Sequence, residues 1–408
     1  MCWRWAVGLT AIGALLAGCT SSAHRGPAPP GTPKSSVATI TLPPDATTAS
    51  ASAPAPAPAS RATTARTATI LGSGDVLIHP PLWEQAHADA LAEGSSGYDF
   101  GPMYSSIAPT VRTADVAICE METPLAPAQG PFSGWPDFSA PPQVLTALKA
   151  VGYRTCTTAS NHSLDQGYDG VKRTLDELDA AGLKHTGSAR TAAEAARTLL
   201  ITLANGVRVA QLAYSFDFNG IAMPADKPWL ANLTDVSTIL AAAHRAKLAG
   251  ADIVVLSMHW GTEYDHLATQ TQRDQAAQLL ASPDIDVILG DHAHVVQPMQ
   301  KINGKWVIYC MGNQISRHAD PIDDSREGVM PEFTFTEVSP HKFRITKAEA
   351  VPTWMDISPA LRLVDLPIAL HAPATTASQL AVYRRVYAKI SAYLDAYGAS
   401  KQGMVIAG

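Results

Sequence analysis

The amino-acid sequence predicts an α/β sandwich, in which β-sheets are covered by helices. From Thr67 onward, apolar β-branched runs alternate with amphipathic segments of helical spacing, which is typical of sheets packed against helices. Several of the apolar runs are followed directly by a carboxylate, an amide or an imidazole. Open α/β sheets place their chemistry beyond the carboxyl ends of strands, so these side chains are expected to share one site.

The predicted strands are short apolar runs bounded by turn residues. They are Thr67 to Leu71, Asp115 to Cys119, Tyr153 to Thr158, Asp252 to Met258, Asp286 to Leu289 and Lys305 to Cys310. Asn205-Gly206 predicts a hairpin within Leu199 to Phe216, because this pair favours a tight two-residue turn. A further antiparallel pair is predicted around Val329 to Val338 and Phe343 to Val351.

The predicted helices lie between these strands and follow from apolar residues at helical spacing. They are Pro102 to Thr113, Pro141 to Val151, Asp165 to Ala181, Thr234 to Leu248, Gln270 to Leu280 and Ser378 to about Tyr397. In the third of these, Asp165 is the expected N-cap, and Gly182 ends the helix.

The first 66 residues are not expected to belong to the fold. An apolar run from Ala6 to Ala17 ends at Leu16-Ala17-Gly18-Cys19; it is too short to span a bilayer and has the form of a secretory signal. The small-residue site resembles a bacterial lipobox, which predicts a signal peptide over residues 1–19 and a lipid on Cys19. The alternative is an ordinary signal peptide cut nearby. Residues 20–66 are rich in Ala, Pro, Ser and Thr and predict a disordered tether, followed by one folded domain over residues 67–400.

Composition restricts the class of partner. Of 408 residues, 46% are hydrophobic and 16% are charged, with a formal net charge of -6, so the chain can bury a large core. No run of Lys or Arg offers the basic footprint that nucleic-acid binding requires, and no nucleic-acid partner is expected. Cys119, Cys156 and Cys310 lie in apolar runs, and we expect free, buried thiols that pack as small hydrophobes.

The candidate metal ligands follow the predicted strands in order. They are Asp75, Glu122, Asn161, His259, His292 and His294. Carboxylate, amide and imidazole groups converging at strand ends suit one or two divalent ions such as Mn, Fe or Zn. His292 and His294 alternate after a buried strand, so they are expected to point to the same side.

Each candidate also has a purely structural interpretation. Asp75 could be a turn acid after Gly-Ser-Gly, Asn161 or Asp165 could cap a helix, and His259 could be a buried core residue. Three residues near the main candidates are possible additional site residues: His79, Glu120 and Asp291. Glu120 lies on the same side of a strand as Glu122 by the two-residue period, so these two could exchange roles. Trp135, in a Pro-rich loop, could line a substrate groove or only hold that loop in place.

The ordered motifs together resemble a known family. They are Gly74-Asp75, Glu122 in EMETPL, Asn161-His162 with Asp165, His259-Trp260-Gly261 with Glu263-Tyr264, His292-Ala293-His294-Val295 after Gly290, and Met311-Gly312-Asn313. This series resembles the CapA (poly-γ-glutamate capsule biosynthesis) family, which is similar to the calcineurin-like metallophosphoesterases in fold and motif order. The resemblance covers roughly Thr67 to Trp354. It implies a four-layer α/β/β/α sandwich with a dinuclear metal site at one edge.

The sequence departs from the family pattern at three places. Glu120 stands where the family usually has Asn, Asp291 stands where a His is commoner, and Gln314 stands where Phe often follows Gly-Asn. None of these changes removes a candidate ligand. Glu120 and Asp291 instead add two acids near the site, which could alter the choice of metal or the preferred charge of the substrate.

The ligand set implies a division of roles. One ion would be held by Asp75, Glu122 and His294, and the other by Glu122, Asn161, His259 and His292, so that Glu122 bridges them. His162 would donate a proton to the leaving group, and Asp165 would fix its tautomer. Paired ions of this kind activate water and stabilise charge on the attacked group.

The resemblance leads to an expected function at the cell surface. We expect a metal-dependent hydrolase or transferase that acts on poly-γ-glutamate or a related anionic envelope polymer. The expected partners are that polymer, the membrane through the N-terminal lipid, and membrane synthase subunits, and the expected location is extracytoplasmic and lipid-anchored. Two alternatives remain: a metallophosphoesterase or nucleotidase, and a non-catalytic component that holds polymer for a synthase.

Overall fold

The structure, a computed structural model, describes residues 65–318 and 323–408. The predicted signal peptide, Cys19 and most of the predicted tether lie outside the described residues. The larger sheet runs in the order β14 (Arg362–Asp365), β13 (Lys342–Asp356), β12 (Glu327–Ser339), β1 (Thr67–Val76), β2 (Val116–Glu120), β3 (Thr155–Thr157) and β4 (Lys184–Thr186). Two further strands join it: β11 (Asn313–Ile315) pairs with β1, and β15 (Met404–Ile406) pairs with β13. The sheet therefore continues beyond residue 400.

The second sheet contains six strands. Its order is β5 (Leu199–Thr202), β6 (Arg208–Ser215), β7 (Ile253–His259), β8 (Val287–Asp291), β10 (Lys305–Ile308) and β9 (Met299–Ile302). The predicted hairpin is confirmed, because β5 and β6 pair antiparallel on either side of Asn205-Gly206. The antiparallel pair formed by β12 and β13 is confirmed as well.

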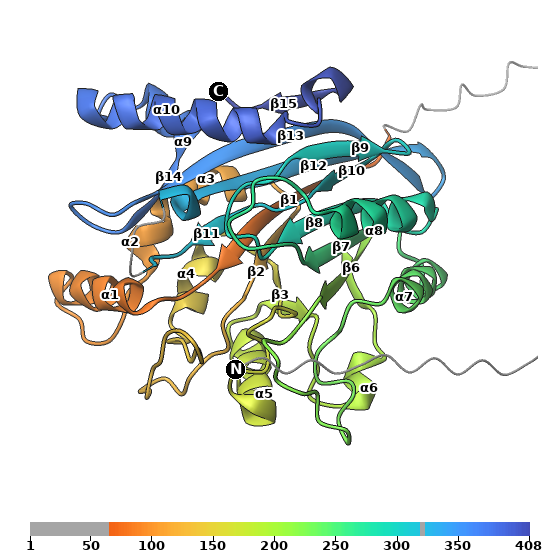
Figure 1. Ribbon diagram of the computed structural model, residues 1–408, viewed down its shortest axis with the longest axis horizontal. Coiled ribbons are helices and arrows are strands. Elements are labelled where there is room, and N and C mark those ends of the chain that lie inside the picture. The colour runs from red at the N-terminus through yellow and green to blue at the C-terminus, as the bar shows by residue number, and fades with distance from the viewer. Residues whose placement is uncertain (1–64, 319–322) are drawn as a thin grey trace, which may run out of the picture. The chain divides into compact units, whose positions relative to one another are not determined.

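Helices cover the outer faces of the two sheets (Figure 1). The longer helices are α1 (Pro80–Ala92), α4 (Val144–Val151), α5 (Gly167–Ala180), α7 (Val236–Leu248), α8 (Gln270–Ala281) and α10 (Ala377–Leu394). The shorter ones are α2 (Gly101–Tyr104), η1 (Ser105–Ile107), α3 (Ala108–Val111), α6 (Ala192–Ala195), η2 (Asp323–Arg326), α9 (Leu366–His371) and η3 (Ser400–Gln402).

Alternating side chains along the strands create the layers. In β1, Ile70 joins the core between the two sheets, whereas Leu71 packs with the helices on the outer face. In β7, Val255 faces the same inter-sheet core, whereas Val254 packs against α7 and α8. This two-residue alternation is the geometry of a strand that is buried on both faces. The predicted four-layer α/β/β/α sandwich is thereby confirmed.

Several predicted elements differ in detail. The helix expected over Pro102 to Thr113 is divided into α2, η1 and α3. Pro109 lies at the start of α3, where it has no N–H to donate into a continuous helix. The helix expected to start at Asp165 has Gln166 as its N-cap, because the Asp165 carboxylate is bonded elsewhere. Helix α1 was not predicted; its buried face is made largely of small residues such as Ala86 and Ala90.

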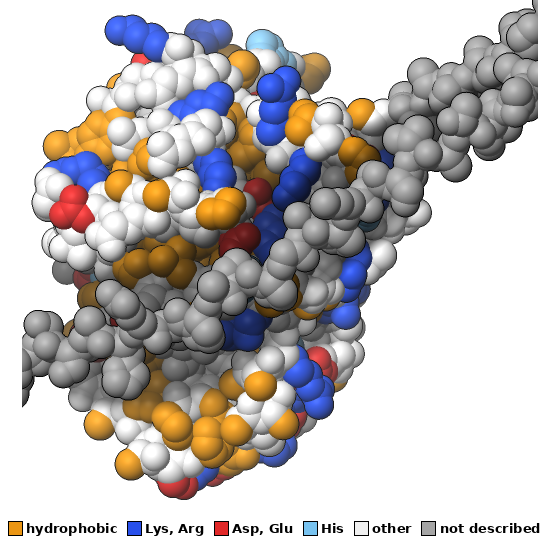
Figure 2. Space-filling model, turned by 90° about the vertical axis from the view of Figure 1, so that its right-hand side faces the viewer, with side chains coloured by type: hydrophobic (Ala, Val, Ile, Leu, Met, Phe, Trp, Pro, Cys, Tyr) orange, Lys and Arg blue, Asp and Glu red, His pale blue; other side chains and the backbone are white. Residues whose placement is uncertain are grey.

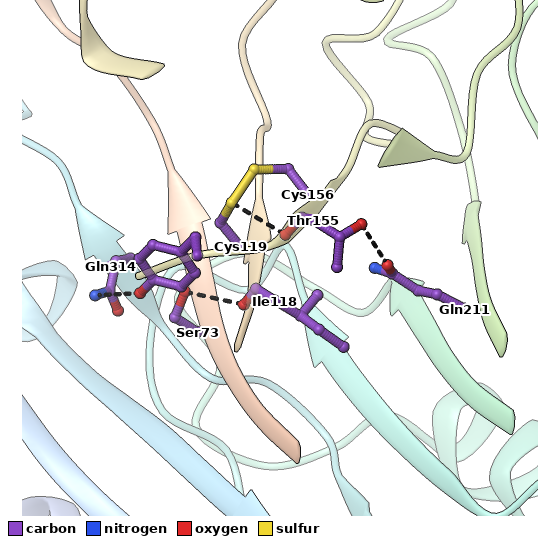
Figure 3. Close-up of a disulfide and its surroundings, with 8 residues drawn as sticks. Ser73, Ile118, Cys119, Thr155, Cys156, Gln211 and Gln314 are labelled. Atoms are coloured by element: carbon purple, nitrogen blue, oxygen red, sulfur yellow. Dashed lines mark hydrogen bonds between the residues drawn. A yellow bond between two sulfur atoms is a disulfide. The ribbon is translucent and has the colours of Figure 1, made fainter. Parts of the chain in front are cut away.

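The expectation of free thiols is wrong for two of the three cysteines. Cys119 of β2 and Cys156 of β3 are paired residues of adjacent parallel strands, and they form a disulfide with Cα atoms 4.4 Å apart (Figure 3). Neighbouring strands bring the two side chains together, which their spacing in the sequence does not reveal. Cys310 is free and buried, as expected. Beside the disulfide, the Thr155 hydroxyl donates to Gln211 Oε1 of the second sheet at 2.7 Å (Figure 3).

Two observations concern membrane and nucleic-acid partners. Within residues 65–318 and 323–408, no helix combines the length and the apolar character needed to cross a bilayer. Figure 2 shows Lys and Arg side chains spread over one face among hydrophobic and neutral side chains.

Candidate metal centre

The register of the strands brings the candidate ligands to one edge. Asp75 near the end of β1 lies opposite Glu120 of β2 on one side and Asn313 of β11 on the other. The close contact between β1 and the Gly312 backbone depends on Gly74, since a Cβ atom at residue 74 would lie 1.7 Å from Gly312 O. In the second sheet, the end of β7 pairs His259 with Asp291 of β8. Parallel strands end at a common edge, and both sheets contribute to it.

Asp75, Glu122 and His294 form the first cluster. Their ligand atoms lie within 4.8 Å of one another. His294 Nδ1 is 3.0 Å from Asp75 Oδ2, and His294 Nε2 is 3.8 Å from Glu122 Oε1. The carboxylate of Asp75 also accepts a hydrogen bond from the backbone N–H of His292, at 3.2 Å. This cluster has the composition expected for one of the two ions.

Asp75, Glu120 and His259 form the second cluster, again with ligand atoms within 4.8 Å of one another. Asn161 Oδ1 lies 2.9 Å from His259 Nε2, and the His292 ring centroid lies 4.8 Å from that of His259. Asp75 is thus the residue common to both clusters, and Glu120 occupies the place expected for Glu122. The bridging role of Glu122 stays a prediction.

Several buried carboxylates of the site lack hydrogen-bond partners. Both side-chain oxygens of Glu120 and of Glu122 are buried without a hydrogen-bond partner, as is Asp291 Oδ1. Burial, followed by neighbouring charges such as Asp75, raises the pKa of Glu120 and Asp291 well above the ordinary value. Burial likewise raises the pKa of Glu122, against an opposing contribution from His294. Unpartnered buried carboxylates are costly unless a cation joins them, so the donor set fits divalent metal.

The histidines divide into two electrostatic classes. Burial and neighbouring histidines lower the pKa of His259 well below its ordinary value and that of His292 to about 3, so both are neutral and have a lone pair for a metal. Burial also lowers the pKa of His294, but Glu122 and Asp75 outweigh it and raise the value to about 10. In the metal-free protein the His294 proton partly neutralises the carboxylates, and metal binding would release it.

Both late histidines have left-handed backbone conformations, with φ of 90° at His292 and 57° at His294. Both follow the end of β8 and lie in a loop, so strand alternation is not what orients them. The expectation that they lie on the same side is nevertheless met, since their ligand atoms lie within 4.8 Å of one another. Their ring centroids are 5.9 Å apart. Strained backbone is found where a surrounding structure fixes a functional geometry, and here the turn brings both imidazoles together with Glu263.

His162 lies beside the clusters but has a different set of partners. Its Nδ1 is 2.7 Å from Asp165 Oδ2, which fits the predicted orienting role and leaves Nε2 available to the pocket. The same Asp165 oxygen accepts a hydrogen bond from the backbone N–H of Phe138 at 2.8 Å. Burial raises the pKa of Asp165, and the hydrogen bond from His162 opposes this effect. The Asp165 carboxylate therefore binds His162 and the Phe138 backbone and does not cap α5, whose N-cap is Gln166.

A pocket of about 690 Å³ opens beside these side chains, and His162, Asn161 and His294 line it. Trp135 also lines it and is 77% exposed, which favours the groove interpretation of this residue. His79 lines the pocket but belongs to none of the ligand clusters of the described residues. Its ring packs 4.6 Å from that of His318, and burial lowers its pKa to about 3. Asp291 is also outside the clusters, so of the three additional candidates only Glu120 joins one.

Three residues of the site were missed or given no role by sequence reasoning. Glu263 lies within 4.8 Å of ligand atoms of His292 and His294. Asn313 Oδ1 is 3.0 Å from His294 Nδ1. Asn219, with φ of 50°, accepts a hydrogen bond from Asn161 Nδ2 at 3.2 Å. The Asn219-Gly220 pair marks a turn in the sequence, but nothing there indicates that the turn folds over the site.

The comparison with families identifies the class. Residues 69–318 match the family described as bacterial capsule synthesis protein PGA_cap, which is more than half of the chain. The chain belongs to this family, as its motifs predict. The PGA biosynthesis protein CapA of Bacillus subtilis (strain 168) is 33% identical over 167 residues, covering 41% of this chain and 43% of that protein.

Two other relatives match the chain at a similar level of sequence identity. The capsule biosynthesis protein CapA of Bacillus anthracis is 30% identical over 178 residues, which are 43% of each protein. A probable polyglutamine synthesis accessory protein of Mycobacterium tuberculosis is 29% identical over 226 residues, covering 52% of this chain and 59% of that protein. The matched region is therefore 43% to 59% of the length of these relatives.

Two solved structures have some likeness to the chain. A 5'-nucleotidase precursor from Thermus thermophilus has a TM-score of 0.45 and 13% identity, covering 80% of this chain and 58% of that one. The calcineurin-like phosphoesterase YfkN from Bacillus subtilis has a TM-score of 0.45 and 14% identity, covering 81% of this chain and 99% of that one.

Proposed function

We propose that this protein is a metal-dependent hydrolase or transferase of a capsule or envelope polymer, with poly-γ-glutamate as the first candidate substrate. Family membership supports the polymer class. The observation that carries the catalytic part is the pair of buried carboxylates, Glu120 and Glu122, whose oxygens lack hydrogen-bond partners, beside the imidazoles of His259 and His294. A surface that only binds polymer needs no such costly arrangement.

The proposed metal site has two halves. Asp75, Glu122 and His294 would hold one ion, and Asp75, Glu120 and His259 would hold the other, with Asn161 and His292 adjacent to the second. Divalent ions there would lower the pKa of water and neutralise charge on the attacked carbonyl or phosphoryl group.

The remaining residues handle the proton. Amide hydrolysis joins the oxygen of water to the carbonyl carbon, breaks the carbon–nitrogen bond and adds a proton to the departing nitrogen. The imidazolium form of His162 would supply that proton from Nε2 and regain one from the attacking water, while Asp165 accepts the hydrogen bond from Nδ1–H at 2.7 Å and so orients the ring. In a transfer reaction, an acceptor nucleophile replaces water and the same proton is required.

The test is release of glutamyl fragments from poly-γ-glutamate by the full-length protein. We expect release with added Mn, Fe or Zn, none in EDTA, and none with Glu122→Ala. The control His244→Ala changes an exposed histidine far from the described clusters and should retain activity. Rapid hydrolysis of simple phosphodiesters without action on the polymer would instead support a phosphoesterase, and metal-free polymer binding without turnover would support a non-catalytic holder.

A polyanion is at first sight a poor ligand for an acidic protein, but the electrostatic interactions differ between short range and long range. Bound divalent ions outweigh carboxylates at close range, whereas long-range repulsion persists at low salt. We therefore propose that turnover of polymer improves with moderate ionic strength, which screens exposed charges over about 10 Å at 0.1 M.

A further inference from the structure

The pocket beside the metal ligands contains acids but no Lys or Arg among the residues that line it, all of which lie in the described part of the chain. Its basic groups are the histidines His79, His162, His294 and His318. Apart from these imidazoles and bound metal, the residues that line the pocket therefore offer no cation with which to bind the carboxylates of a polymer.

Two walls of the pocket combine an aromatic ring with an acid. Residues 133–139, which we call the tryptophan loop, supply Trp135 and Asp137, and the segment after β7 supplies Glu263 and Tyr264. Trp135 is 77% and Tyr264 39% exposed, so both rings offer surface to a ligand. Neither the Asp137 nor the Glu263 carboxylate has a hydrogen bond or ion pair with the described residues, whereas Asp165 is engaged by His162.

The tryptophan loop has a defined conformation. Ser133 and Ser139 exchange backbone hydrogen bonds of 3.1 and 2.9 Å, and Phe138 N–H donates to Asp165. The opposite wall is fixed by Tyr264 N–H, which donates to Ala293 O at 2.8 Å. The two pairs of aromatic and acidic side chains are therefore held on anchored backbone, as a preorganised recognition site requires.

Bound metal would not remove the negative charge of these walls. Asp75, Glu120, Glu122 and Asp291 are buried together near the clusters, and two divalent ions would balance these four carboxylates. Asp137 and Glu263 would remain uncompensated at the mouth. An ammonium group gains from such carboxylates and from the faces of Trp and Tyr rings, whereas a carboxylate without an ammonium group on the same carbon is repelled there.

We propose that the mouth of the pocket binds a primary ammonium group, so that the enzyme acts at the amino-terminal end of a glutamyl chain. This inference rests on the proposed function and specifies which part of the substrate enters first. In a γ-linked glutamyl polymer, every internal nitrogen is an amide, and only the chain end has an ammonium. Binding that end at the mouth of the pocket, where Asp137 and Glu263 belong to the lining, would direct the first amide bond toward the metal ligands.

The test compares a γ-linked glutamyl trimer with a free amino end and the same trimer with an acetylated amino end. Binding is measured by titration calorimetry on the metal-loaded full chain with His162→Ala, which prevents turnover from obscuring affinity. We expect the free amine to bind at least about tenfold more tightly, the scale of one ion pair with a cation–aromatic contact. Glu263→Gln should abolish most of that preference, and Trp135→Ala should reduce it.

Controls separate charge recognition from damage to the site. Glu84→Gln changes an exposed acid that lies outside the pocket and should leave the preference intact. Metal content is measured in every variant, because Glu263 lies near His292 and His294. If Glu263→Gln loses metal, Glu263 is a ligand and the inference is wrong.

The remaining outcomes are distinct from those of the polymer assay. Equal binding of the two trimers, tighter binding of the acetylated one, or no binding of either overturns the ammonium site. A preference for the amine without fragment release from polymer by the wild-type protein would retain the ammonium site and reject the proposed hydrolase.

Discussion

At the scale of single residues, two histidines near Asn161 have contrasting environments. His259 is buried at the end of β7, with Nε2 2.9 Å from Asn161 Oδ1 and Nδ1 3.7 Å from a Glu120 oxygen. His162 instead directs Nδ1 to Asp165 at 2.7 Å and lines the pocket. The first arrangement suits a metal ligand and the second suits a proton donor that is held by a carboxylate.

This contrast predicts that replacement by Ala has different consequences at His259 and at His162. His259→Ala should lose most bound metal, because it removes a nitrogen from a buried ligand cluster. His162→Ala should retain the one to two equivalents of metal expected for a paired site while turnover falls about 100-fold or more. Elemental analysis and initial rates on the full-length variants measure both effects, with His244→Ala as control. Comparable metal loss in the two variants would refute the division of roles.

Sequence reasoning identified most single residues of the site but not their arrangement. Asp75, Glu122 and His294 do converge, and this was predictable because ordered motifs at strand ends can be recognised from the sequence alone. The inclusion of Glu120 with Asp75 and His259 depends on the register between β1 and β2, which the sequence does not display. Asn219 was missed because it comes from a loop whose path over the site is set by tertiary packing.

At the scale of elements, the long apolar strands were predictable and the short peripheral elements were not. The strands β6, β7 and β8 are buried on both faces and read as continuous apolar runs. Strand β4, with exposed and half-buried residues, gives no such signal. The disulfide between Cys119 and Cys156 joins strands that are neighbours only after folding, so strand order had to be known first.

Helix α10 is attached to the rest of the domain through a polar cluster. Lys389 of α10 lies 3.0 Å from Glu327 Oε1 at the start of β12 and also pairs with Asp324 of η2. Asp324 in turn contacts His266 at 3.0 Å, and the His266 ring stacks on Tyr393 of α10. Burial raises the pKa of Glu327 to about 7 even though Lys389 lowers it, since the ammonium is partly exposed and shared with Asp324.

This raised pKa predicts a pH dependence of stability. Glu327 has an ordinary value of 4.5 and a folded value of about 7, so the folded state binds more protons between these values. Its contribution to the free energy of unfolding should be fully present below about pH 4.5 and lost as pH rises through about 7. Relative to Glu327→Gln, the wild type should lose on the order of 1–3 kcal/mol across that window.

Denaturant unfolding of both proteins at several pH values measures this difference. The substitution Glu84→Gln removes an exposed carboxylate and should leave a curve parallel to that of the wild type. A difference between wild type and Glu327→Gln that stays constant from pH 4.5 to 7 would mean that Glu327 keeps an ordinary pKa in the folded protein.

At the scale of the whole molecule, we propose that catalysis belongs to the residues from 65 onward and that membrane attachment belongs to the segment before them. We propose that the lipobox-like Leu16-Ala17-Gly18-Cys19 leads to lipidation of Cys19 and that the Pro-rich stretch to residue 66 is a tether. A single acyl chain gives weak, reversible attachment, whereas two chains hold a protein stably at a bilayer. The domain would then work outside the cytoplasm, where envelope polymers and their synthases are accessible.

The anchor is tested by fractionating cells that express the full chain. Wild-type protein should sediment with membranes, and Cys19→Ala should lose the lipid and appear in soluble fractions or the medium. Cys310→Ala, which removes a buried thiol of the domain, is the matched control and should remain with membranes. Retention of Cys19→Ala in the membrane fraction would show that another feature attaches the protein.

We propose that the double use of one Asp165 oxygen limits how this site can diversify. Because that oxygen accepts hydrogen bonds from both His162 Nδ1 and Phe138 N–H, the tryptophan loop and the proposed proton donor share a single fixed point. Insertions or deletions in residues 133–139 would also displace His162, so a specificity gained in this way would lower the rate of the proposed reaction. Side-chain exchange at Trp135 and Asp137, with the loop length kept, leaves the backbone contact intact. Descendants of this chain, natural or engineered, are therefore expected to change substrates by substitution before they change loop length.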